Sequence, residues 1–359
     1  MRITRREVFG TVTTGVVAAG STVRAAGFGC SSAPPALGVV ADSFGIRRRA
    51  EREGGQEGLN DPLAMLAHCR AIGAAGVQMP IGIRDAAAAR AIHDRLDTSG
   101  LYLEASIALP QDRGDLDRFD REIRTAAQSG ATIARTVMLN GRRYEDFDSA
   151  SAFLRWGDDA RQRLALAEPI VARNRIQLAV ENHKDWRVDE LLEILGKLGS
   201  HHVGVCVDTG NNLSLLEDPT EVVASLAPLA LTTHFKDIAV RETGDGFLLA
   251  EVPLGEGFLD LARFHQLLST ARPGIHFNLE MLTRNPLRIP CLTPTYWATL
   301  ARVSGRDAAL ALGLVRRHGR AHPLPSVDGL TLQQQIALEA ANVQKSLEYA
   351  RNFPERRPS

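Results

Sequence analysis

The sequence has 359 residues, of which 44% are hydrophobic and 23% are charged, so the chain can bury a large core and general disorder is excluded. Its 42 basic and 42 acidic residues cancel, which argues against nucleic acid or an anionic membrane as a partner and favours a small, largely neutral substrate. Four cysteines without C-x-x-C spacing exclude a disulfide scaffold; we interpret them as buried or incidental thiols (Cys30, Cys69, Cys206 and Cys291).

Residues 1–35 are predicted to be a twin-arginine-type signal peptide and a short linker. The segment Thr4–Phe9 (TRREVF) resembles the twin-arginine consensus, and an apolar stretch continues to Val23. This stretch is too short and too weakly hydrophobic for a transmembrane helix. We therefore expect export to the periplasm or the extracellular space without a stable membrane anchor. A chance Arg pair in an unrelated tail is the alternative, and lipidation of Cys30 is left open.

From residue 36 onward, short apolar runs alternate with amphipathic stretches of helical period, which indicates βα units and a parallel sheet. The expected strands are Ala36–Ala41, Gly76–Met79, Leu101–Ile107, Thr132–Leu139, Ile176–Glu181, Val203–Val207, Leu231–His234 and His276–Met281. The expected helices include Pro62–Ile72, Ala86–Leu96, Leu116–Ser129, Ala150–Arg173, Val188–Leu198 and Thr220–Leu226. Eight such units predict a closed (β/α)8 TIM barrel over residues 36–283.

Residues 284–359 do not continue this alternation. They contain a Pro-rich stretch, a helical segment at Arg306–Arg317 and a long amphipathic helix at Thr331–Asn352. We predict a C-terminal helical extension packed on the barrel, which either covers one barrel end or makes an oligomer contact. A homo-oligomer is an open expectation, because the sequence shows no recognisable interface.

Acidic and imidazole side chains stand at the ends of the last four expected strands. They are Glu181, Asp208, His234 and Glu280. Catalytic groups of a parallel barrel project from these strand ends, and carboxylates left unpaired there would be costly. Three carboxylates and one imidazole suit one divalent ion, Mn²⁺ first, with Mg²⁺, Co²⁺ or Zn²⁺ also acceptable. The alternative is four separate residues bonded to loop amides or arginines.

Five motifs together resemble the xylose isomerase-like TIM-barrel superfamily, the sugar phosphate isomerase/epimerase family. They are ENH at Glu181–His183, DTGN at Asp208–Asn211, HFKD at His234–Asp237, PLGEG at Pro253–Gly257, and Leu279-Glu280. The resemblance covers about residues 36–283. It implies that the four strand-end residues hold one metal ion, which chelates a carbonyl and a neighbouring hydroxyl of a sugar and stabilises an enediolate.

The resemblance also implies that Glu181 and Glu280 act as paired base and acid, with metal ligation alone as the alternative. His183 and Lys236, each two residues beyond a proposed ligand, are expected to face the same cavity and contact substrate. The alternatives are that His183 buttresses a ligand and that Lys236 forms a surface ion pair with Asp237. Arg241 is a further substrate contact implied by resemblance to the epimerases.

Three further side chains are candidates for substrate binding. Trp186 either stacks on a sugar ring or packs in the core. Glu104 and Arg135 are charged residues inside apolar runs, so they either form a mutual ion pair under the pocket or bind substrate.

Two positions depart from the family pattern. Asn211, which we count among the substrate-binding residues, stands where the apurinic endonuclease branch and ketose 3-epimerases carry histidine, and Gln78 stands where many members have Glu. Asn211, the lack of histidine in Gly76–Pro80 and the lack of an Asp-x-His motif after His234 exclude a trinuclear zinc cluster, which argues against DNA repair. Two reactions stay open: isomerisation or epimerisation of a keto sugar, and β-elimination (dehydratase or lyase chemistry) from a 3-keto sugar or keto-glycoside. A non-catalytic exported sugar-binding barrel is the alternative of another class, against which the presence of both Glu181 and Glu280 argues.

Overall fold

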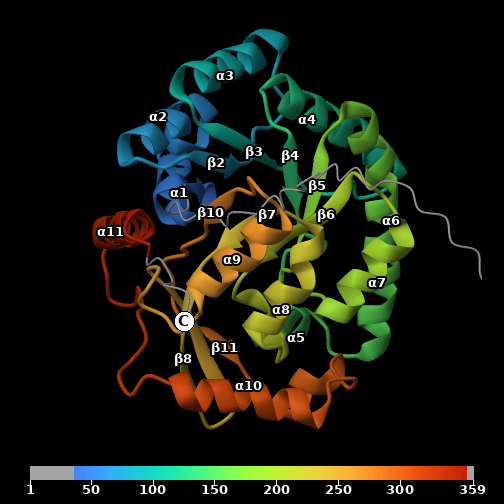
Figure 1. The fold of residues 1–359 in the computed structure, drawn as a ribbon, viewed down its shortest axis with the longest axis vertical. Helices are drawn as coiled ribbons and strands as arrows, with labels where there is room; N and C mark the ends of the chain where they lie inside the picture. The colour runs from blue at the N-terminus through green and yellow to red at the C-terminus, as the bar shows by residue number, and fades with distance from the viewer. Residues whose placement is uncertain (1–35, 354–359) are drawn as a thin grey trace, which may run out of the picture. The chain divides into compact units, whose positions relative to one another are not determined.

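The computed structural model describes residues 36–353; the predicted signal peptide with Cys30 and residues 354–359 lie outside this part. Its main feature is a closed barrel of parallel strands in the order β1-β10-β7-β6-β5-β4-β3-β2 (Figure 1). The barrel strands are β1 (Leu37–Val40), β2 (Gly76–Met79), β3 (Tyr102–Ser106), β4 (Ile133–Thr136), β5 (Gln177–Glu181), β6 (Val203–Asp208), β7 (Ala230–Phe235) and β10 (Phe277–Leu279). The predicted (β/α)8 fold is confirmed, and each expected strand overlaps an observed one.

Helices surround this barrel. They are α1 (Gly45–Glu53), α2 (Pro62–Ile72), α3 (Ala86–Ser99), α4 (Leu116–Gln128), α5 (Arg143–Asp146), α6 (Ala150–Asn174), α7 (Val188–Leu198), α8 (Pro219–Leu226), α9 (Leu261–Ala271), α10 (Gly305–His318) and α11 (Leu332–Arg351). Their ends follow local chemistry: α2 begins where the Asp61 carboxylate accepts the Ala64 N–H, and it ends at Gly73, whose φ of 78° is left-handed. Such signals explain why the predicted bounds of α2 match the observed ones.

The strands are buried on both faces, as parallel strands covered by helices must be. In β6, Val203, Val205 and Val207 join the large core cluster, while Cys206 and Asp208 occupy the alternate positions. Cys69, Cys206 and Cys291 are buried free thiols, as predicted.

A second, three-stranded sheet is a feature that the sequence analysis overlooked. It consists of β8 (Asp237–Thr243), β9 (Gly246–Val252) and β11 (Leu287–Ile289), with both pairings antiparallel. The β8–β9 hairpin is inserted between β7 and α9, and α10 packs on β8. Phe247 and Ile289 belong, with Val315 of α10, to a separate apolar cluster. This sheet lies beyond β7 and therefore borders the residues that follow His234.

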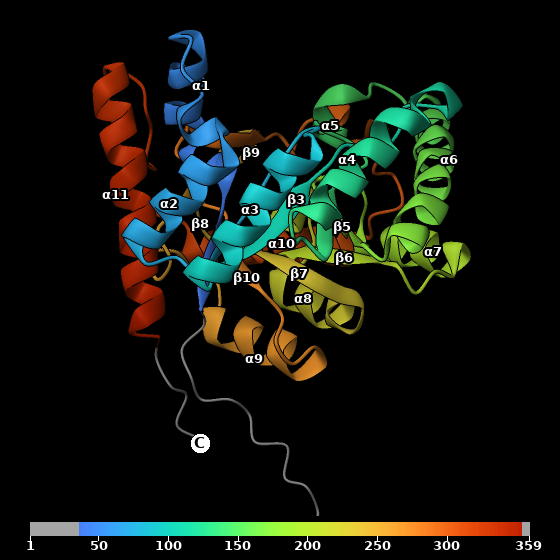
Figure 2. The ribbon, with the colours of Figure 1, turned by 90° about the horizontal axis from the view of Figure 1, so that it is seen from above.

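The last helix, α11, lies beside α1 near the other end of the described chain (Figure 2). Their contact includes a polar link, because the Glu339 carboxylate accepts the backbone N–H groups of Ile46 and Arg47 at 2.7 and 3.1 Å. Within residues 36–353, no helix has the length and apolar content that crossing a lipid bilayer requires.

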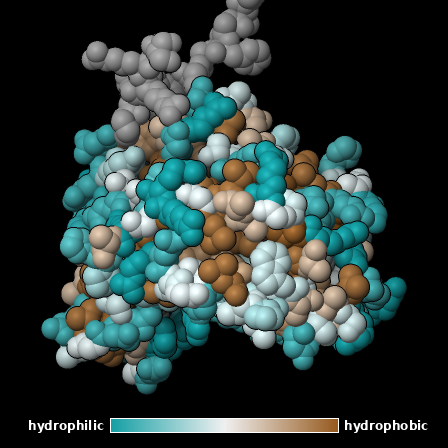
Figure 3. Space-filling view, turned by 90° about the horizontal axis from the view of Figure 1, so that it is seen from below, coloured by the Kyte–Doolittle hydropathy of each residue, from teal (hydrophilic) through white to brown (hydrophobic). Residues whose placement is uncertain are grey.

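Large hydrophobic side chains that are exposed in residues 36–353 are dispersed along the chain: Ile83, Leu154, Leu229, Leu292, Leu310 and Leu332. On the face shown in Figure 3, hydrophobic residues gather near the centre and hydrophilic residues occupy most of the periphery. The homo-oligomer stays a prediction.

Candidate metal centre

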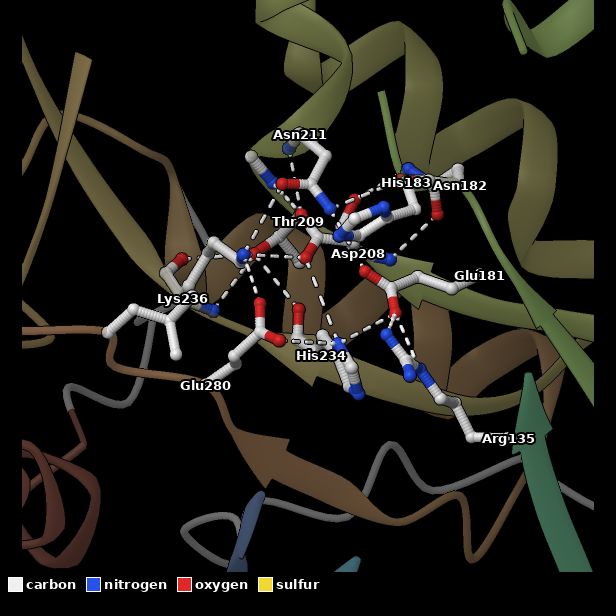
Figure 4. Close-up of polar contacts among 12 residues, drawn as sticks. Arg135, Glu181, Asn182, His183, Asp208, Thr209, Asn211, His234, Lys236 and Glu280 are labelled. Atoms are coloured by element: carbon white, nitrogen blue, oxygen red, sulfur yellow. Dashed lines mark hydrogen bonds and ion pairs between the residues drawn. The ribbon is translucent and has the colours of Figure 1, made fainter. Parts of the chain in front are cut away.

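The four strand-end residues converge at one end of the barrel (Figure 4). Glu181 and Asp208 end β5 and β6, His234 lies in β7, and Glu280 follows β10. All four are buried, and each offers one ligand atom that lies within 4.8 Å of the others. The Nδ1 atom of His234 is 3.3 Å from Glu181 Oε2 and 3.2 Å from Glu280 Oε1. These residues could bind a metal ion in the way the sequence predicted.

The imidazole of His234 is held from its other side. Its Nε2 lies 2.7 Å from Gln78 Oε1, and the Gln78 amide donates to Glu104 Oε2 at 2.9 Å. An Nε2–H that donates to Gln78 leaves Nδ1 free to act as a ligand. Nδ1 is buried and has no hydrogen-bond partner among residues 36–353. A buried polar atom of this kind needs an explanation, and a metal ion among three carboxylates supplies one.

Glu104 anchors this arrangement from the barrel interior. Its carboxylate accepts hydrogen bonds from Thr232 at 2.9 and 2.8 Å, from Asn278 at 3.1 Å and from the His276 ring at 2.7 Å. Of the two alternatives for Glu104 and Arg135, the mutual ion pair is wrong, because Glu104 bonds to Gln78 and Thr232 and Arg135 bonds to Glu181. Glu104 is fully buried and does not line the cavity described below, so it supports the site from beneath.

Glu181 is positioned by Arg135 and Asn211. Arg135 donates to Glu181 Oε2 from Nε at 2.7 Å and also from its terminal nitrogen, while the Asn211 amide donates to Oε1 at 3.0 Å. Burial favours the neutral acid, but the positive charge of Arg135, together with that of the His234 ring when it is protonated, outweighs burial and holds the pKa of Glu181 well below its ordinary range. Glu181 is therefore an oriented carboxylate that is ready to bind a cation.

Asp208 presents one carboxylate oxygen to the loop and the other to the cluster. The backbone N–H groups of Gly210 and Asn211 donate to Oδ1 at 2.9 and 2.7 Å. Oδ2 lies 2.7 Å from the Lys236 ammonium. Burial raises the pKa of Asp208 to about 6, opposed by Lys236 and reinforced by Glu280 and Glu181. The DTGN motif thus fixes the orientation of a metal-ligand candidate.

Lys236 lies inside the carboxylate cluster. Its ammonium contacts Glu280 Oε2 and Asp208 Oδ2, and it lies 3.5 Å from Glu251 Oε1. The alternative of a surface ion pair with Asp237 is wrong, since Lys236 is buried. The charge of Lys236 offsets part of the negative charge of the three carboxylates.

Asp237 instead holds the loop that contains the PLGEG motif. Its carboxylate accepts the backbone N–H groups of Gly255, Gly257 and Leu259 at 3.0, 2.9 and 3.1 Å. A Cβ atom on Gly257 would lie 2.0 Å from Asp237 Oδ1, which explains the glycine at this position. The motif is a structural support beside the site.

A cavity of about 490 Å³ opens next to the cluster. Its lining includes Arg135, His183, Lys184, Glu280 and Arg284. The His183 ring bonds to the Leu139 carbonyl through Nδ1 at 3.1 Å, and burial lowers the pKa of His183 to about 3. The ring is therefore neutral, and its Nε2 is an acceptor for a hydroxyl group. Glu280 and His183 thus line one cavity with Arg135.

Two predicted substrate contacts lie elsewhere. Trp186 is buried, and the centroid of its ring lies 5.1 Å from that of Trp156 and 5.2 Å from that of Phe153, both in α6. Of its two predicted roles, packing in the core is therefore the one observed. Arg241 lies in β8, opposite Leu248 of β9, and does not line the cavity. Both follow strand ends in the sequence, but the chain carries them away from the barrel mouth.

Two residues near the site were not predicted from the sequence. Lys184 lines the cavity and is 4% exposed. Glu251 is a buried carboxylate in β9 that pairs with Arg284 at 2.9 Å. A charged residue inside the apolar run FLLAEV was the available signal for Glu251, and the place of Lys184 directly after the ENH motif was the signal for that residue.

The fold and these residues define a (β/α)8 barrel with a candidate divalent-metal site at the carboxyl ends of its strands. Residues 66–303 match the family model described as the xylose isomerase-like TIM barrel. The chain belongs to this family, as its five motifs predicted.

One curated relative and two solved structures illustrate the similarity. Over 118 residues the chain is 33% identical to the 3-oxo-isoapionate decarboxylase of Pectobacterium atrosepticum; this match spans 32% of the chain and 42% of that protein's length. The probable 3-DHS dehydratase AsbF of Bacillus anthracis superposes with a TM-score of 0.52 at 14% identity, covering 75% of this chain and 99% of that one. An L-ribulose 3-epimerase superposes with a TM-score of 0.51 at 12% identity, covering 90% and 100%. The two structures show a shared fold, and the relatives suggest that this protein is an enzyme.

Proposed function

We propose that this protein is a metal-dependent sugar isomerase or epimerase that removes a proton next to the carbonyl of a keto sugar and forms an enediolate. The observation that carries the proposal is the convergence of Glu181, Asp208, His234 and Glu280, with His234 Nδ1 facing the carboxylates. When bound, a divalent ion supplies Lewis-acid stabilisation to the negative charge that develops on the substrate oxygens. Mn²⁺ is the ion we expect first, with Mg²⁺, Co²⁺ or Zn²⁺ as the other candidates.

Glu181 and Glu280 are the proposed proton-transfer residues. Glu280 lines the cavity, and Glu181 is fixed beside it by Arg135 and Asn211. One of the two glutamates, as the carboxylate, accepts the proton next to the carbonyl. The other, as the protonated acid, returns a proton, to the same carbon from the opposite face in epimerisation and to the carbonyl carbon in isomerisation. His183 accepts a hydrogen bond from a substrate hydroxyl and thereby orients the carbon chain in the cavity.

A lyase reaction is the second candidate, and it is favoured by the 33% identity to a 3-oxo-isoapionate decarboxylase. Loss of a proton or of carbon dioxide next to a carbonyl produces an enolate, and in β-elimination this enolate then expels a leaving group from the β carbon. The same site therefore serves elimination or decarboxylation as well as epimerisation. The match covers 42% of that relative's length, so decarboxylation by this protein is a proposal.

Hydrogen–deuterium exchange tests the proposal. The metal-loaded protein in D₂O is screened with free ketoses and with 3-keto-glycosides, and the products are followed by NMR and mass spectrometry. We expect deuterium next to the carbonyl, with an isomer as product for the first candidate and a smaller fragment for the second. Glu181→Gln and Glu280→Gln should each slow exchange by about 100-fold or more, since general acid–base catalysis contributes at least that much.

Glu193→Gln is the matched control, because Glu193 is exposed on α7 and pairs with Lys197, one turn further along the same helix. Exchange at the parent rate in both site variants would refute the acid and base roles. Complete absence of exchange and turnover, despite bound sugar, would identify a non-catalytic sugar-binding barrel instead.

We also propose export through the twin-arginine route. The motif at Thr4–Phe9 supports it, although residues 1–35 lie outside the described structure. The double substitution Arg5→Lys and Arg6→Lys should retain the protein in the cytoplasm of a bacterial host that exports the parent. Equal export of both proteins would contradict the proposal.

A further inference from the structure

Lys184 is a buried cation whose backbone is tightly held. It follows His183 in the loop after β5 and has a φ of 68°. The Lys184 carbonyl accepts the Arg143 N–H at 3.0 Å, and the next residue, Asp185, accepts backbone N–H groups from Leu139 and Trp186 at 3.2 and 2.8 Å. The side chain is 4% exposed and lines the cavity beside Glu280. The loop therefore fixes the backbone of Lys184, and its side chain lines the cavity next to the candidate metal centre.

The acidic residues that line the same cavity already have partners. Asp42 pairs with Arg48 at 3.1 Å, and Glu145 pairs with Arg142. Glu339 accepts two backbone N–H groups of α1, and Glu280 contacts Lys236. Each of these carboxylates thus forms an ion pair or a hydrogen bond with a group other than Lys184.

Two of the arginines that line the cavity are also paired, Arg135 with Glu181 and Arg284 with Glu251. Within residues 36–353, no carboxylate lies within ion-pair distance of the Lys184 ammonium, and the ammonium makes no hydrogen bond. A buried cation without a direct ion-pair partner is costly: burial and the charge of Lys236 lower the pKa of Lys184 to about 8, and the more distant charges of Asp208 and Glu251 oppose this only in part. It is still mostly protonated at pH 7.

A bound metal ion would add further positive charge to the surroundings of Lys184. A divalent cation together with Arg135 and Lys236 outweighs the three carboxylates of the centre by one positive charge. Lys184 adds a second positive charge in the same cavity. A neutral sugar would leave this charge uncompensated, whereas an anionic group would neutralise it.

We propose that Lys184 binds an anionic group of the substrate, a carboxylate or a phosphate, so that the substrate class is the acidic keto sugars. This inference rests on the proposed function for its keto sugar, and it replaces the expectation of a largely neutral substrate. Lys184 is a binding residue in this role, because it holds the far anionic group while the carbonyl lies at the metal centre. The cavity of about 490 Å³ accommodates both ends of a six-carbon chain.

Calorimetric binding of three probes tests the assignment without turnover. D-Gluconate and D-glucitol 6-phosphate carry an anionic group on the polyol chain, and D-glucitol carries none. Each is titrated into the metal-loaded parent, into Lys184→Met and into Lys197→Met at pH 7. Lys197 is the matched control, because it is an exposed lysine of α7 paired with Glu193. Metal chelation by gluconate contributes in every variant, so the comparison is the ratio of affinities between variants.

We expect the parent to bind at least one anionic probe about tenfold or more tightly than glucitol, as a charge-assisted hydrogen bond allows. Lys184→Met should remove that preference, and Lys197→Met should retain it. The better anionic probe then distinguishes a carboxylate from a phosphate. Equal affinity of the parent for all three probes, or an unchanged preference in Lys184→Met, overturns the proposal.

Thermal unfolding verifies that Lys184→Met is folded, and Lys184→Gln replaces it if it is not. If neither variant folds, titration of the metal-free parent with the same three probes decides the substrate class, because metal chelation does not contribute there. The two proposals fail separately: an intact anion preference without deuterium exchange refutes the proposed function alone, and exchange without an anion preference refutes this inference alone.

Discussion

The Nε2 atom of His234 lies 2.7 Å from the side-chain oxygen of Gln78, and this contact turns Nδ1 toward the carboxylates of Glu181 and Glu280. Replacing Gln78 with Met keeps the volume but removes the hydrogen bond. We expect Gln78→Met to weaken Mn²⁺ binding by about tenfold to 100-fold, the usual effect of losing a group that orients a ligand. Competition with a fluorescent chelator measures the affinity. Gln128→Met, at an exposed position at the end of α4, is the control, and equal affinity in both variants would show that Gln78 has no orienting role.

Glu104 should be important for stability rather than for substrate contact. Glu104→Leu would leave donors of Thr232, Asn278 and Gln78 buried without their acceptor. We expect a loss of about 3–5 kcal/mol in the free energy of unfolding, comparable to breaking other buried charged networks. Urea unfolding measures it, with the exposed Glu193→Leu as a control that should change stability by about 0.5 kcal/mol or less. A parent-like unfolding curve for Glu104→Leu would contradict this role.

The four metal-ligand candidates could be predicted from sequence because each stands at the end of an apolar run, and parallel strand ends meet at one rim of a barrel. The hydrogen-bond partners of those residues could not be predicted from the sequence. Gln78 and His234 are 156 positions apart, and their contact depends on side chains that cross the barrel. Periodicity specifies which face a residue occupies, but it does not specify which polar group it meets there.

The errors around the site have similar causes. A mutual ion pair of Glu104 and Arg135 was one of two alternatives, because both are charged residues in apolar runs, yet each side chain has a partner in another strand. Arg241 was placed by its distance in sequence from His234, but the β8–β9 hairpin directs it away from the cavity. That hairpin was predictable, since a Gly-Asp-Gly turn at residues 244–246 separates two strand-like runs.

Metal binding should stabilise the folded protein, because the converged ligands exist only in the folded state. At a free Mn²⁺ concentration 100 times the dissociation constant, we expect a gain of about 2.7 kcal/mol in the free energy of unfolding, reversed by EDTA. Asp208→Ala should abolish most of this gain, whereas Asp158→Ala on the exposed face of α6 should retain it. Thermal unfolding across a Mn²⁺ titration, with metal analysis of the dialysed protein, provides the measurement. A melting temperature that is independent of Mn²⁺ in the parent would argue against the site.

Glu217 should make stability depend on pH at a position away from the metal centre. Burial raises its pKa from 4.5 to about 7, opposed by Arg187 and by the Asn212 hydrogen bond and reinforced by Asp189. Because the folded state favours the protonated acid, Glu217 stabilises the fold fully below pH 4.5, and this contribution is lost as pH rises through about 7. The loss is on the order of 3 kcal/mol.

Glu217→Gln keeps a neutral side chain at every pH, so its stability relative to the parent should increase between pH 4.5 and pH 7 and then level off. Subtracting the two unfolding free energies at each pH removes the titration of all other groups, which both proteins share. Glu193→Gln serves as the control: its exposed side chain has a lowered pKa because of its bond to Lys197, so it should show no such gain. A constant difference between Glu217→Gln and the parent across this range would mean that Glu217 titrates normally in the folded protein, and that its burial is compensated by Arg187 and Asn212.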